Sequence, residues 1–485
     1  LAYLRAFRVF FVLGVAGLLC LSSACTKKKN SYDVDPAETF RTHMLSEPPS
    51  LDWSLSTDTT SSEIQTNIME GLTDIDIWDP LLKLKPALAT AWYSEDSKHW
   101  HFTLRKDVKW TDGIPFTAQH LVDGWERLLN PATASQYSYQ LYSVKNAKAY
   151  NEGKITDFSK VGVRVTESGD LDIELEQPQA FFPQLLFHHS TYPIRKDVVE
   201  KYKEQWTEPE HIVTLGSYIL KKWDHDKALL LERNPYYYGE APKVKFILYY
   251  VINELSTAVN LFDAGEIDAL HDLPTQTINE LKKMPEFKMT PYLGIYYYGF
   301  NTKKKPTDNA DVRRAISMAI DRKEITTLLA GGQLPTSGFI PQGMMGYDPT
   351  AGVKFDPDAA RKLLDKAGYK DRSKFPTLSL GFNTLDQHQR IAENVQEQLK
   401  RNLGISTELS SEEWKTYLNT LRVNPPNIYR HGWVADYPDP DNFLNLFTSY
   451  SENNHTFWGN SEYDSLIEKA VSESDASKRI ELYKQ

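Results

Sequence analysis

The sequence predicts an α/β protein built from two or three domains, and three observations lead to this prediction. The chain has 485 residues, which is more than a single hydrophobic core usually supports. Stretches with the two-residue period of a strand alternate along the chain with stretches that have the period of an amphipathic helix. No internal repeat and no low-complexity segment interrupts this alternation.

The N-terminus has the features of an export signal. Arg5 and Arg8 precede an apolar run over residues 9–21, and small residues then lead to Cys25. This order is typical of a bacterial lipoprotein signal. We therefore expect residues 1–24 to be removed and Cys25 to carry the lipid. A membrane anchor that is never cleaved is the alternative.

A short polar tether and a domain without thiols are expected after the signal. Residues 25–34 contain a lysine run that would separate the lipid from the folded part. The other cysteine, Cys20, lies in the apolar run and would be lost on cleavage. The mature protein would then have no disulfide and no cysteine metal site.

Composition excludes one class of partner. The formal net charge is −10, and no basic stripe is evident, so nucleic acid is not expected as a partner. The 27 tyrosines and 11 tryptophans suit a binding surface that combines contact area with hydrogen-bonding tips. They suit a large core equally well.

The first half of the chain carries clear strand and helix patterns. Apolar Trp100, Phe102 and Leu104 alternate with polar residues, which predicts a strand. Thr117 is placed to cap a helix whose apolar face contains Leu121, Val122, Trp125, Leu128 and Leu129. The nearly continuous apolar run 244–252 predicts a strand buried on both faces.

Further helices follow in order. We expect them over 258–267, over 312–322 with Asp311 as cap, from Asp356 to Gly368, from about residue 388 to Gly404, and after Ser461 as cap. His99 and His101 would share one face of the predicted strand. Because no third ligand lies near them in sequence, we do not expect a metal site there.

The stretch 429–444 is the candidate for function. Apolar and aromatic residues surround one acidic position, Asp436. Pro438 and Pro440 exclude a regular helix or central strand just after it. We expect a short strand that runs into a rigid loop, where a carboxylate can meet a ligand cation. An ordinary surface loop with several acids is the alternative.

The residues 433–437, W-V-A-D-Y, together with several other segments, resemble the bacterial extracellular solute-binding proteins of the oligopeptide-binding family. The run 102–131 is the most recognisable of these segments, and 216–220, 229–238 and 265–268 match as well. The resemblance implies a two-lobed periplasmic-binding-protein-like α/β fold of type II, in its large form with an extra domain, joined by a hinge. It also implies that the family pattern continues beyond Gln485 and returns to the first lobe.

The resemblance also implies a division into domains. Lobe I would comprise residues 35–69 and 191–293, and the extra domain II would comprise 70–190. Residues 294–485 would form lobe III.

Asp436 matches the family position that pairs with the α-amino group of a bound peptide. Arg430 and His388 match positions that hold the carboxylate of short peptides in some members. A surface salt bridge is the alternative for Arg430, and a helix-start residue without a ligand is the alternative for His388. A lysine used by some members is absent, with Ala330 at about its place.

Other matching positions would surround the peptide. Trp414, Trp433, Tyr292 and Tyr297 would supply the walls of roomy pockets, although core packing is the alternative for Trp414 and inward packing of an edge strand for the tyrosines. Thr57 and Thr59 belong to a loop that would pair with the peptide backbone as an added β-strand does.

The function implied is the capture of oligopeptides for the permease and ATPase complex of an ABC importer. The protein would be a lipid-anchored monomer with no cofactor and no catalytic activity. A relative that binds a nickel chelate, haem, a sugar or murein peptides is one alternative. A surface-adhesion or signalling lipoprotein that reuses the fold is another.

An exported hydrolase is the competing class. The sequence contains no H-E-x-x-H, no G-x-S-x-G and no P-loop. Acid pairs such as Asp439 and Asp441 could serve hydrolysis. Proline-rich loops with several acids are common, however, so this pair is weak support for an enzyme.

Overall fold

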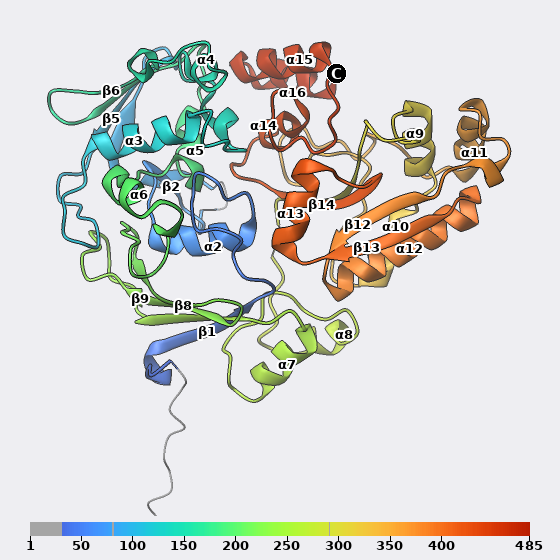
Figure 1. Ribbon diagram of the computed structural model, residues 1–485, viewed down its shortest axis with the longest axis horizontal. Coiled ribbons are helices and arrows are strands. Elements are labelled where there is room, and N and C mark those ends of the chain that lie inside the picture. The colour runs from blue at the N-terminus through green and yellow to red at the C-terminus, as the bar shows by residue number, and fades with distance from the viewer. Residues whose placement is uncertain (1–31, 80–81, 291) are drawn as a thin grey trace, which may run out of the picture.

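The computed structural model describes residues 32–79, 82–290 and 292–485. These residues form three four-stranded sheets, one two-stranded sheet and many helices (Figure 1). The predicted α/β class is therefore confirmed. The predicted signal, Cys25 and most of the tether lie outside the described residues. Within the described part, no helix combines the length and the apolar character needed to cross a membrane.

The first sheet joins the start of the chain to residues much later in sequence. Its order is β1-β10-β9-β8, and β10 is parallel to β1 and antiparallel to β9. Three consecutive residues of β10, 247–249, are buried, as expected for the apolar run 244–252. The strands of this sheet are β1 (Thr39–Met44), β8 (Tyr218–Asp224), β9 (Ala228–Arg233) and β10 (Phe246–Val251).

The second sheet has the order β4-β5-β7-β6 and packs on helix α3. Phe102 and Leu104 of β5 are buried, as their alternation predicts. Thr117 is the N-cap of α3 and forms a capping box with His120. The strands and helix are β4 (Ala89–Tyr93), β5 (His99–Leu104), β6 (Val163–Val165), β7 (Leu171–Glu174) and α3 (Ala118–Leu129).

Short elements lie before, between and after the strands of these two sheets. A hairpin of β2 and β3 precedes β4, and α2 leads into it. The 3-10 helices are η1 (Pro36–Glu38), η2 (Ser138–Leu141), η3 (Phe158–Lys160), η4 (His189–Thr191) and η5 (Lys203–Gln205). The others are β2 (Thr73–Ile75), β3 (Leu84–Pro86), α2 (Thr59–Ile68), α4 (Ala147–Asn151), α5 (Phe182–Leu185), α6 (Lys196–Tyr202), α7 (Leu255–Asp263) and α8 (Ile278–Leu281).

The third sheet, with order β11-β14-β12-β13, occupies the right-hand half of Figure 1. β14 is antiparallel to β11 and parallel to β12. The predicted strand before Asp436 is thus an inner strand of this sheet. The strands are β11 (Gly294–Phe300), β12 (Leu378–Asn383), β13 (Thr407–Glu412) and β14 (Ile428–Val434).

Helices α9 to α13 lie between the strands of the third sheet in sequence. Helices α14 to α16 come after β14 and Asp436. They are α9 (Ala310–Met318), α10 (Arg322–Leu329), α11 (Pro357–Lys366), α12 (Asp386–Leu403), α13 (Trp414–Val423), α14 (Asp441–Leu444), α15 (Ser461–Ser472) and α16 (Ala476–Lys484), with η6 (Arg372–Lys374) and η7 (Asn445–Phe447). Asp356 caps α11, and Gly404 ends α12 in the left-handed region at φ +71°, both as predicted.

Two predicted caps are wrong by one or two residues. α9 is capped by Asn309 rather than Asp311, and α15 by Asn460 rather than Ser461. In both cases an asparagine just upstream has the extended backbone of an N-cap, and its side-chain oxygen accepts a backbone N–H of the first turn. The helix expected over 258–267 also lies earlier, as α7, because Gly265 turns to φ +69° after it.

The distribution of strands parallels the expected domains. Strands of the first sheet come only from 35–69 and 191–293, those of the second from 70–190, and those of the third from 294–485. The exact domain boundaries stay a prediction. The first two sheets form one half of the molecule, and the third sheet with its helices forms the other. One hydrophobic cluster spans the first two sheets and also includes Trp433, Tyr437 and Phe443 of the other half, so the two halves are in contact.

Candidate ligand-binding site between the lobes

Asp436 lies where the two halves of the molecule meet. It follows the end of β14, and its side chain is only 12% exposed. Its Oδ1 atom lies 3.3 Å from His188 Nε2 and 3.5 Å from the hydroxyl of Tyr137. Both of these residues precede β8 and belong to the other half. The rigid loop predicted from the prolines therefore places a carboxylate against the opposite lobe.

Asn442 holds Asp436 from its own side. The Asn442 amide donates to Asp436 Oδ2 at 3.0 Å, and its carbonyl oxygen accepts both the Asp436 backbone N–H and the Trp433 indole N–H, each at 2.9 Å. A carboxylate offers about four acceptor positions. His188, Tyr137 and Asn442 occupy three of them, so one more charged donor can be accommodated.

The charge of Asp436 affects the pKa of Tyr137. Burial raises the pKa of this tyrosine well above its usual value, and the negative charge of Asp436 adds to the effect. The hydroxyl therefore stays protonated and donates its hydrogen. Asp436 is thus surrounded by hydrogen-bond donors rather than by other acids.

Arg430 and His388 come together on one face of the third sheet. The guanidinium of Arg430 lies 4.9 Å from the ring centroid of Tyr296, and its Nη1 donates to Asn383 Oδ1 at 3.1 Å. The hydroxyl of Tyr296 lies 3.4 Å from His388 Nδ1. No carboxylate among the described residues forms an ion pair with Arg430, and its buried Nε has no hydrogen-bond partner there.

His388 is neutral in this setting. It is 7% exposed, and burial together with the positive charge of Arg430 holds its pKa well below the usual value. A neutral imidazole therefore lies near an arginine that forms no ion pair with the described residues. The two residues proposed for the peptide carboxylate are thus adjacent.

The predicted aromatic walls do not all lie on that face. Trp433 is buried, and its ring lies 6.2 Å from that of Tyr137 in the other half. Tyr297 is on the same face of the sheet as Trp433 and packs on His431 and Phe339, with centroids 5.5 and 4.9 Å away. Tyr292 precedes β11 and is 70% exposed.

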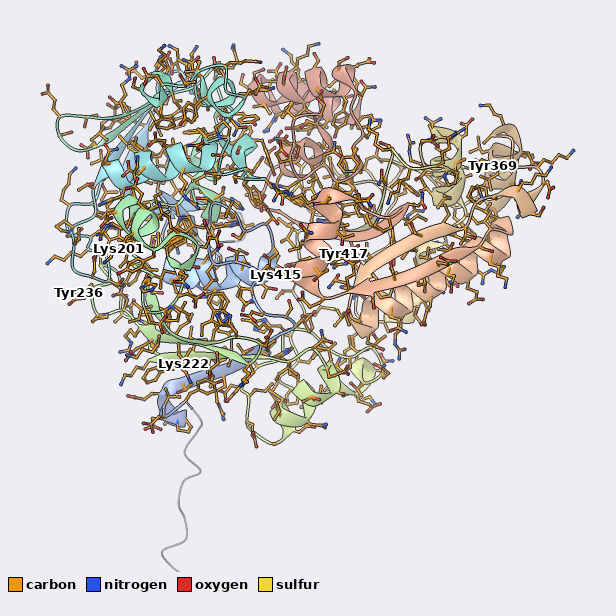
Figure 2. The ribbon with its side chains drawn as sticks, viewed as in Figure 1. Lys201, Lys222, Tyr236, Tyr369, Lys415 and Tyr417 are labelled. Atoms are coloured by element: carbon orange, nitrogen blue, oxygen red, sulfur yellow. The ribbon has the colours of Figure 1, made fainter. Side chains whose placement is uncertain are left out.

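Trp414 contacts the other lobe directly. It is the first residue of α13, and its indole N–H donates to Asp58 Oδ1 at 3.4 Å. Asp58 caps α2 and lies between Thr57 and Thr59, of which Thr57 is half-buried and Thr59 exposed. In Figure 2, Lys415 and Tyr417 mark α13 at the side of its lobe that faces α2.

The loop that presents Thr57 is held by a buried ion pair. Asp52 accepts two hydrogen bonds from Arg127 of α3, at 2.8 and 2.6 Å, and one from the indole of Trp206 at 3.3 Å. The backbone N–H groups of Leu55 and Ser56 then bond to the Asp52 carbonyl. These contacts give the loop a defined position next to the gap between the lobes.

The acid pair considered for hydrolysis has internal partners. Asp439 accepts from Arg479 of α16 at 2.7 Å, and Asp441 accepts from the hydroxyl of Tyr437 at 2.7 Å. Both acids are buried, and burial together with the charge of Asp439 raises the pKa of Asp441 to about 6. These contacts indicate that the pair holds α16 and the loop in place.

Sequence reasoning missed several residues of this site. His188, Tyr137, Asp58 and Asn383 lie far from their partners in sequence, and nothing in their local pattern indicates the contact. Asn442 lies only six residues after Asp436. An amide after two prolines is a signal for a side chain that closes a loop, so this contact could have been anticipated.

Donors and acids that face one another between two lobes are an arrangement expected of a ligand-binding protein. The model of the family "Bacterial extracellular solute-binding proteins, family 5 Middle" matches residues 83–455. The chain belongs to this family of extracellular solute-binding proteins, which confirms the resemblance noted from the motifs.

Curated relatives span most of the chain. The oligopeptide-binding protein OppA of Bacillus subtilis is 35% identical over 463 residues, which are 92% of this chain and 84% of the relative. The periplasmic oligopeptide-binding protein OppA of Escherichia coli is 36% identical over 439 residues, covering 87% and 79%.

Solved structures share the fold. The murein tripeptide binding protein MppA of Escherichia coli has a TM-score of 0.88 at 32% identity, covering 92% of this chain and 89% of that one. Haemophilus influenzae OppA in complex with RPPGFSPFR has a TM-score of 0.87 at 32% identity, covering 93% and 90%. The predicted two-lobed periplasmic-binding-protein fold is confirmed.

One further neighbour bears on how the lobes are arranged. The unliganded open form of MppA has a TM-score of only 0.61 at 33% identity, although it covers 92% of this chain and 88% of its own. The present structure is therefore closer to the peptide-bound neighbour than to the open form. The contacts of Asp436 with His188 and of Trp414 with Asp58 belong to this closed arrangement.

Proposed function

We propose that the protein captures oligopeptides between its lobes and delivers them to an ABC importer, without catalysing a reaction. The observation that carries the proposal is Asp436, a largely buried carboxylate at the lobe interface with an acceptor position to spare. The names of the OppA relatives and the peptide in one neighbouring structure support the same class of ligand.

The amine end of the peptide binds at Asp436. Burial of an unpaired ammonium costs several kcal/mol, so a closed protein needs a counter-charge for it. Asp436 provides that charge, and Asn442 orients the carboxylate. His188 and Tyr137 share the same oxygen, so an ammonium there joins groups from both lobes into one network.

The carboxylate of a short peptide binds at Arg430. This arginine has no acidic partner among the described residues, and neutral His388 and Tyr296 lie beside it. Arg430 lies within β14, and Asp436 lies two residues after its end. The two ends of a short peptide would therefore be bound by residues of one strand and the loop that follows it. Trp433, Tyr297, Tyr292 and Trp414 would contact its side chains, and the loop with Thr57 and Thr59 would bond its backbone.

Transport follows from closure. A ligand that contacts both lobes favours the closed form, and an importer that recognises this form receives only loaded protein. The permease and ATPase are the proposed partners. The motif around Cys25 supports attachment to the membrane by lipid, which would keep a monomeric receptor close to that importer.

Murein peptides are the second candidate ligand. The similarity to MppA, which is named for a murein tripeptide, supports them, and they would occupy the same site because they present the same kinds of charged groups. Competition between a murein tripeptide and an ordinary tripeptide in one titration would rank the two.

Calorimetric titration with trialanine tests the proposal, together with chromatography of the recovered peptide. We expect saturable binding at one site and recovery of the intact tripeptide. Free alanine appearing with time would identify a peptidase instead. Absence of binding by trialanine and by a tetrapeptide would reject peptide capture altogether.

A further inference from the structure

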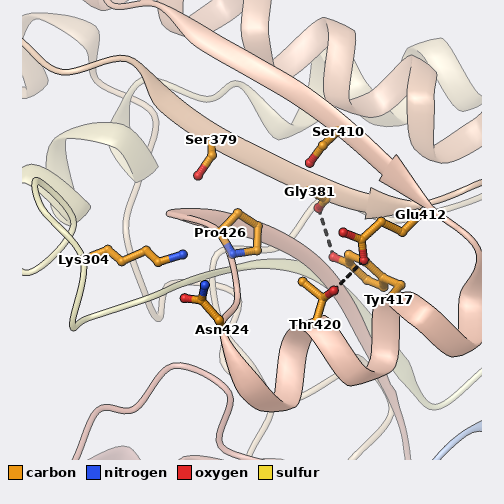
Figure 3. Close-up of a pocket in the computed structure, with 9 residues that line it drawn as sticks. All are labelled: Lys304, Ser379, Gly381, Ser410, Glu412, Tyr417, Thr420, Asn424 and Pro426. Atoms are coloured by element: carbon orange, nitrogen blue, oxygen red, sulfur yellow. Dashed lines mark hydrogen bonds between the residues drawn. The ribbon is translucent and has the colours of Figure 1, made fainter.

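A cavity lies between helix α13 and the third sheet. It has a volume of about 280 Å³ and is bounded by β12, β13, α13 and the segment that precedes α9 (Figure 3). Sites for drug-sized ligands usually measure ~300–1,000 Å³. The size of this cavity therefore suits a molecule of few atoms. None of the residues proposed for the peptide lines it.

Two opposite charges line this cavity without reaching each other. Lys304 extends into it toward Pro426 (Figure 3), and Glu412 lies at the end of β13. Lys304 forms no ion pair within 4.0 Å and no side-chain hydrogen bond with any residue that the structure describes. Burial lowers its pKa.

Glu412 has a free oxygen. Its Oε2 accepts the hydroxyl of Thr420 at 2.6 Å, while Oε1 has no partner among the described residues. A carboxylate with one oxygen engaged is oriented but not neutralised. The cavity thus offers one cationic and one anionic group, each open to a ligand.

The wall between them is polar and firmly held. The hydroxyl of Tyr417 donates to the backbone oxygens of Gly381 and Arg430, at 3.0 and 2.7 Å, so its ring has a defined position (Figure 3). Ser410 adds a hydroxyl, and Asn424 adds an amide at the end of α13. A small polar molecule would find donors and acceptors around it.

We propose that this cavity is a second ligand site, which binds a small zwitterion such as a free amino acid. The carboxylate of the ligand pairs with Lys304, and its ammonium pairs with Glu412. A ligand with only one charge would leave the other residue unpaired. The zwitterion is therefore preferred over an anion or a cation of the same size.

Titration of the full chain with glycine, L-glutamine and 4-aminobutyrate tests the proposal. Acetate, which has only the carboxylate, and ethylamine, which has only the ammonium, are the controls. We expect at least one zwitterion to bind with a dissociation constant of about 1 mM or below. Acetate and ethylamine should bind at least about tenfold more weakly. If none of the three zwitterions binds by about 10 mM, the proposal fails.

Variants locate the binding. Lys304→Met and Glu412→Gln should each weaken it about tenfold or more, and Ser410→Phe should block the cavity. The matched controls Lys303→Met and Glu408→Gln, which change exposed residues of the same two segments, should leave it unchanged. Asp436→Asn should also leave it unchanged. Loss of binding in Asp436→Asn, or full binding by Lys304→Met, would place the ligand elsewhere and overturn the inference.

Discussion

The contrast between Asp436, Asp439 and Asp441 shows how surroundings give neighbouring acids different roles. Asp439 forms an ion pair with Arg479, and Asp441 accepts a hydrogen bond from the hydroxyl of Tyr437. Both acids thus have partners within their own lobe. Asp436 is oriented by Asn442 and faces the opposite lobe. Only the last arrangement leaves a charge at the interface for a ligand.

The proposed role of Arg430 can be tested by replacing this single residue. Replacement by methionine keeps the length of the side chain but removes the proposed partner of the peptide carboxylate. We expect Arg430→Met to weaken trialanine binding about tenfold or more, as the loss of a charged hydrogen bond usually does. Titration of the variant with trialanine and with trialanine amide measures this.

The amide provides the internal control. Because it carries no negative charge, its affinity should change little in Arg430→Met. Arg390→Met, which removes a half-buried arginine that pairs with Asp386, should alter neither titration. A similar loss for both peptides in Arg430→Met would show that the arginine supports the fold rather than the carboxylate.

Buried histidines predict how stability depends on pH. Burial lowers the pKa of His43 and of His455 to about 4, and the pKa values of His189, His388 and His431 are held well below normal by burial as the first cause. These histidines, with pKa values of about 6.5 in the unfolded chain, bind more protons there than in the folded protein between these limits. Their contribution to the free energy of unfolding should therefore fall as the pH drops from 6.5 toward 4.

Urea unfolding at pH 7, 6 and 5 measures this fall. Each such histidine contributes up to about 1.4 kcal/mol per pH unit in that window. His455→Gln should reduce the slope by up to that amount. An unchanged slope in His455→Gln would contradict the assignment of His455 as buried and neutral.

At the scale of elements, β14 is the centre of the proposed site, because residues of that site lie on both of its faces. Arg430 lies on the face with Tyr296 and His388, and Trp433 lies on the other face, toward Tyr137. The strand, the loop that follows it and the acid could all be predicted from residues 429–444. The identity of the residues opposite the acid could not, because His188 and Tyr137 reach it only through tertiary packing.

Helices were predictable to within a few residues. Capping residues and glycines placed α3, α11 and α12 correctly, since their signals are local. The starts of α9 and α15 were missed where two capping residues compete within one or two positions. The choice between them depends on the backbone entering the helix, which the pattern does not specify.

The ion pair between Asp52 and Arg127, which holds the loop with Thr57, should contribute to the free energy of unfolding. Arg127→Met would leave Asp52 buried, with Trp206 as its remaining side-chain donor. Removal of one partner from a buried pair typically costs about 3–5 kcal/mol, so we expect a loss of that order in the free energy of unfolding. The double variant Asp52→Leu/Arg127→Met should lose less. Equal losses in the single and double variants would contradict the explanation.

At the scale of the whole molecule, the two halves are closed on one another. The family resemblance allowed this architecture to be expected, whereas composition and periodicity alone gave only an α/β class. Trp414 to Asp58 and His188 to Asp436 are contacts between the halves, and both involve residues of the proposed site. Ligand binding and closure should therefore be coupled.

Small-angle X-ray scattering tests this coupling. Without peptide we expect an open form with a larger radius of gyration, and saturating trialanine should reduce it. Trp414→Phe, which removes the donor to Asp58, should weaken closure modestly, and Trp458→Phe serves as the control tryptophan. An unchanged radius despite calorimetrically verified binding would exclude capture by lobe closure.

The central claim is that Asp436 binds the peptide ammonium, and one thermodynamic cycle measures it most directly. Trialanine and N-acetyl-trialanine are titrated into the unaltered protein and into Asp436→Asn. Acetylation should weaken binding to the unaltered protein by about 3–5 kcal/mol, at least a hundredfold, because it removes the charge that faces a buried acid. In Asp436→Asn the two peptides should bind with nearly equal affinity. Equal binding of both peptides by the unaltered protein, or an undiminished effect of acetylation in the variant, would contradict the claim.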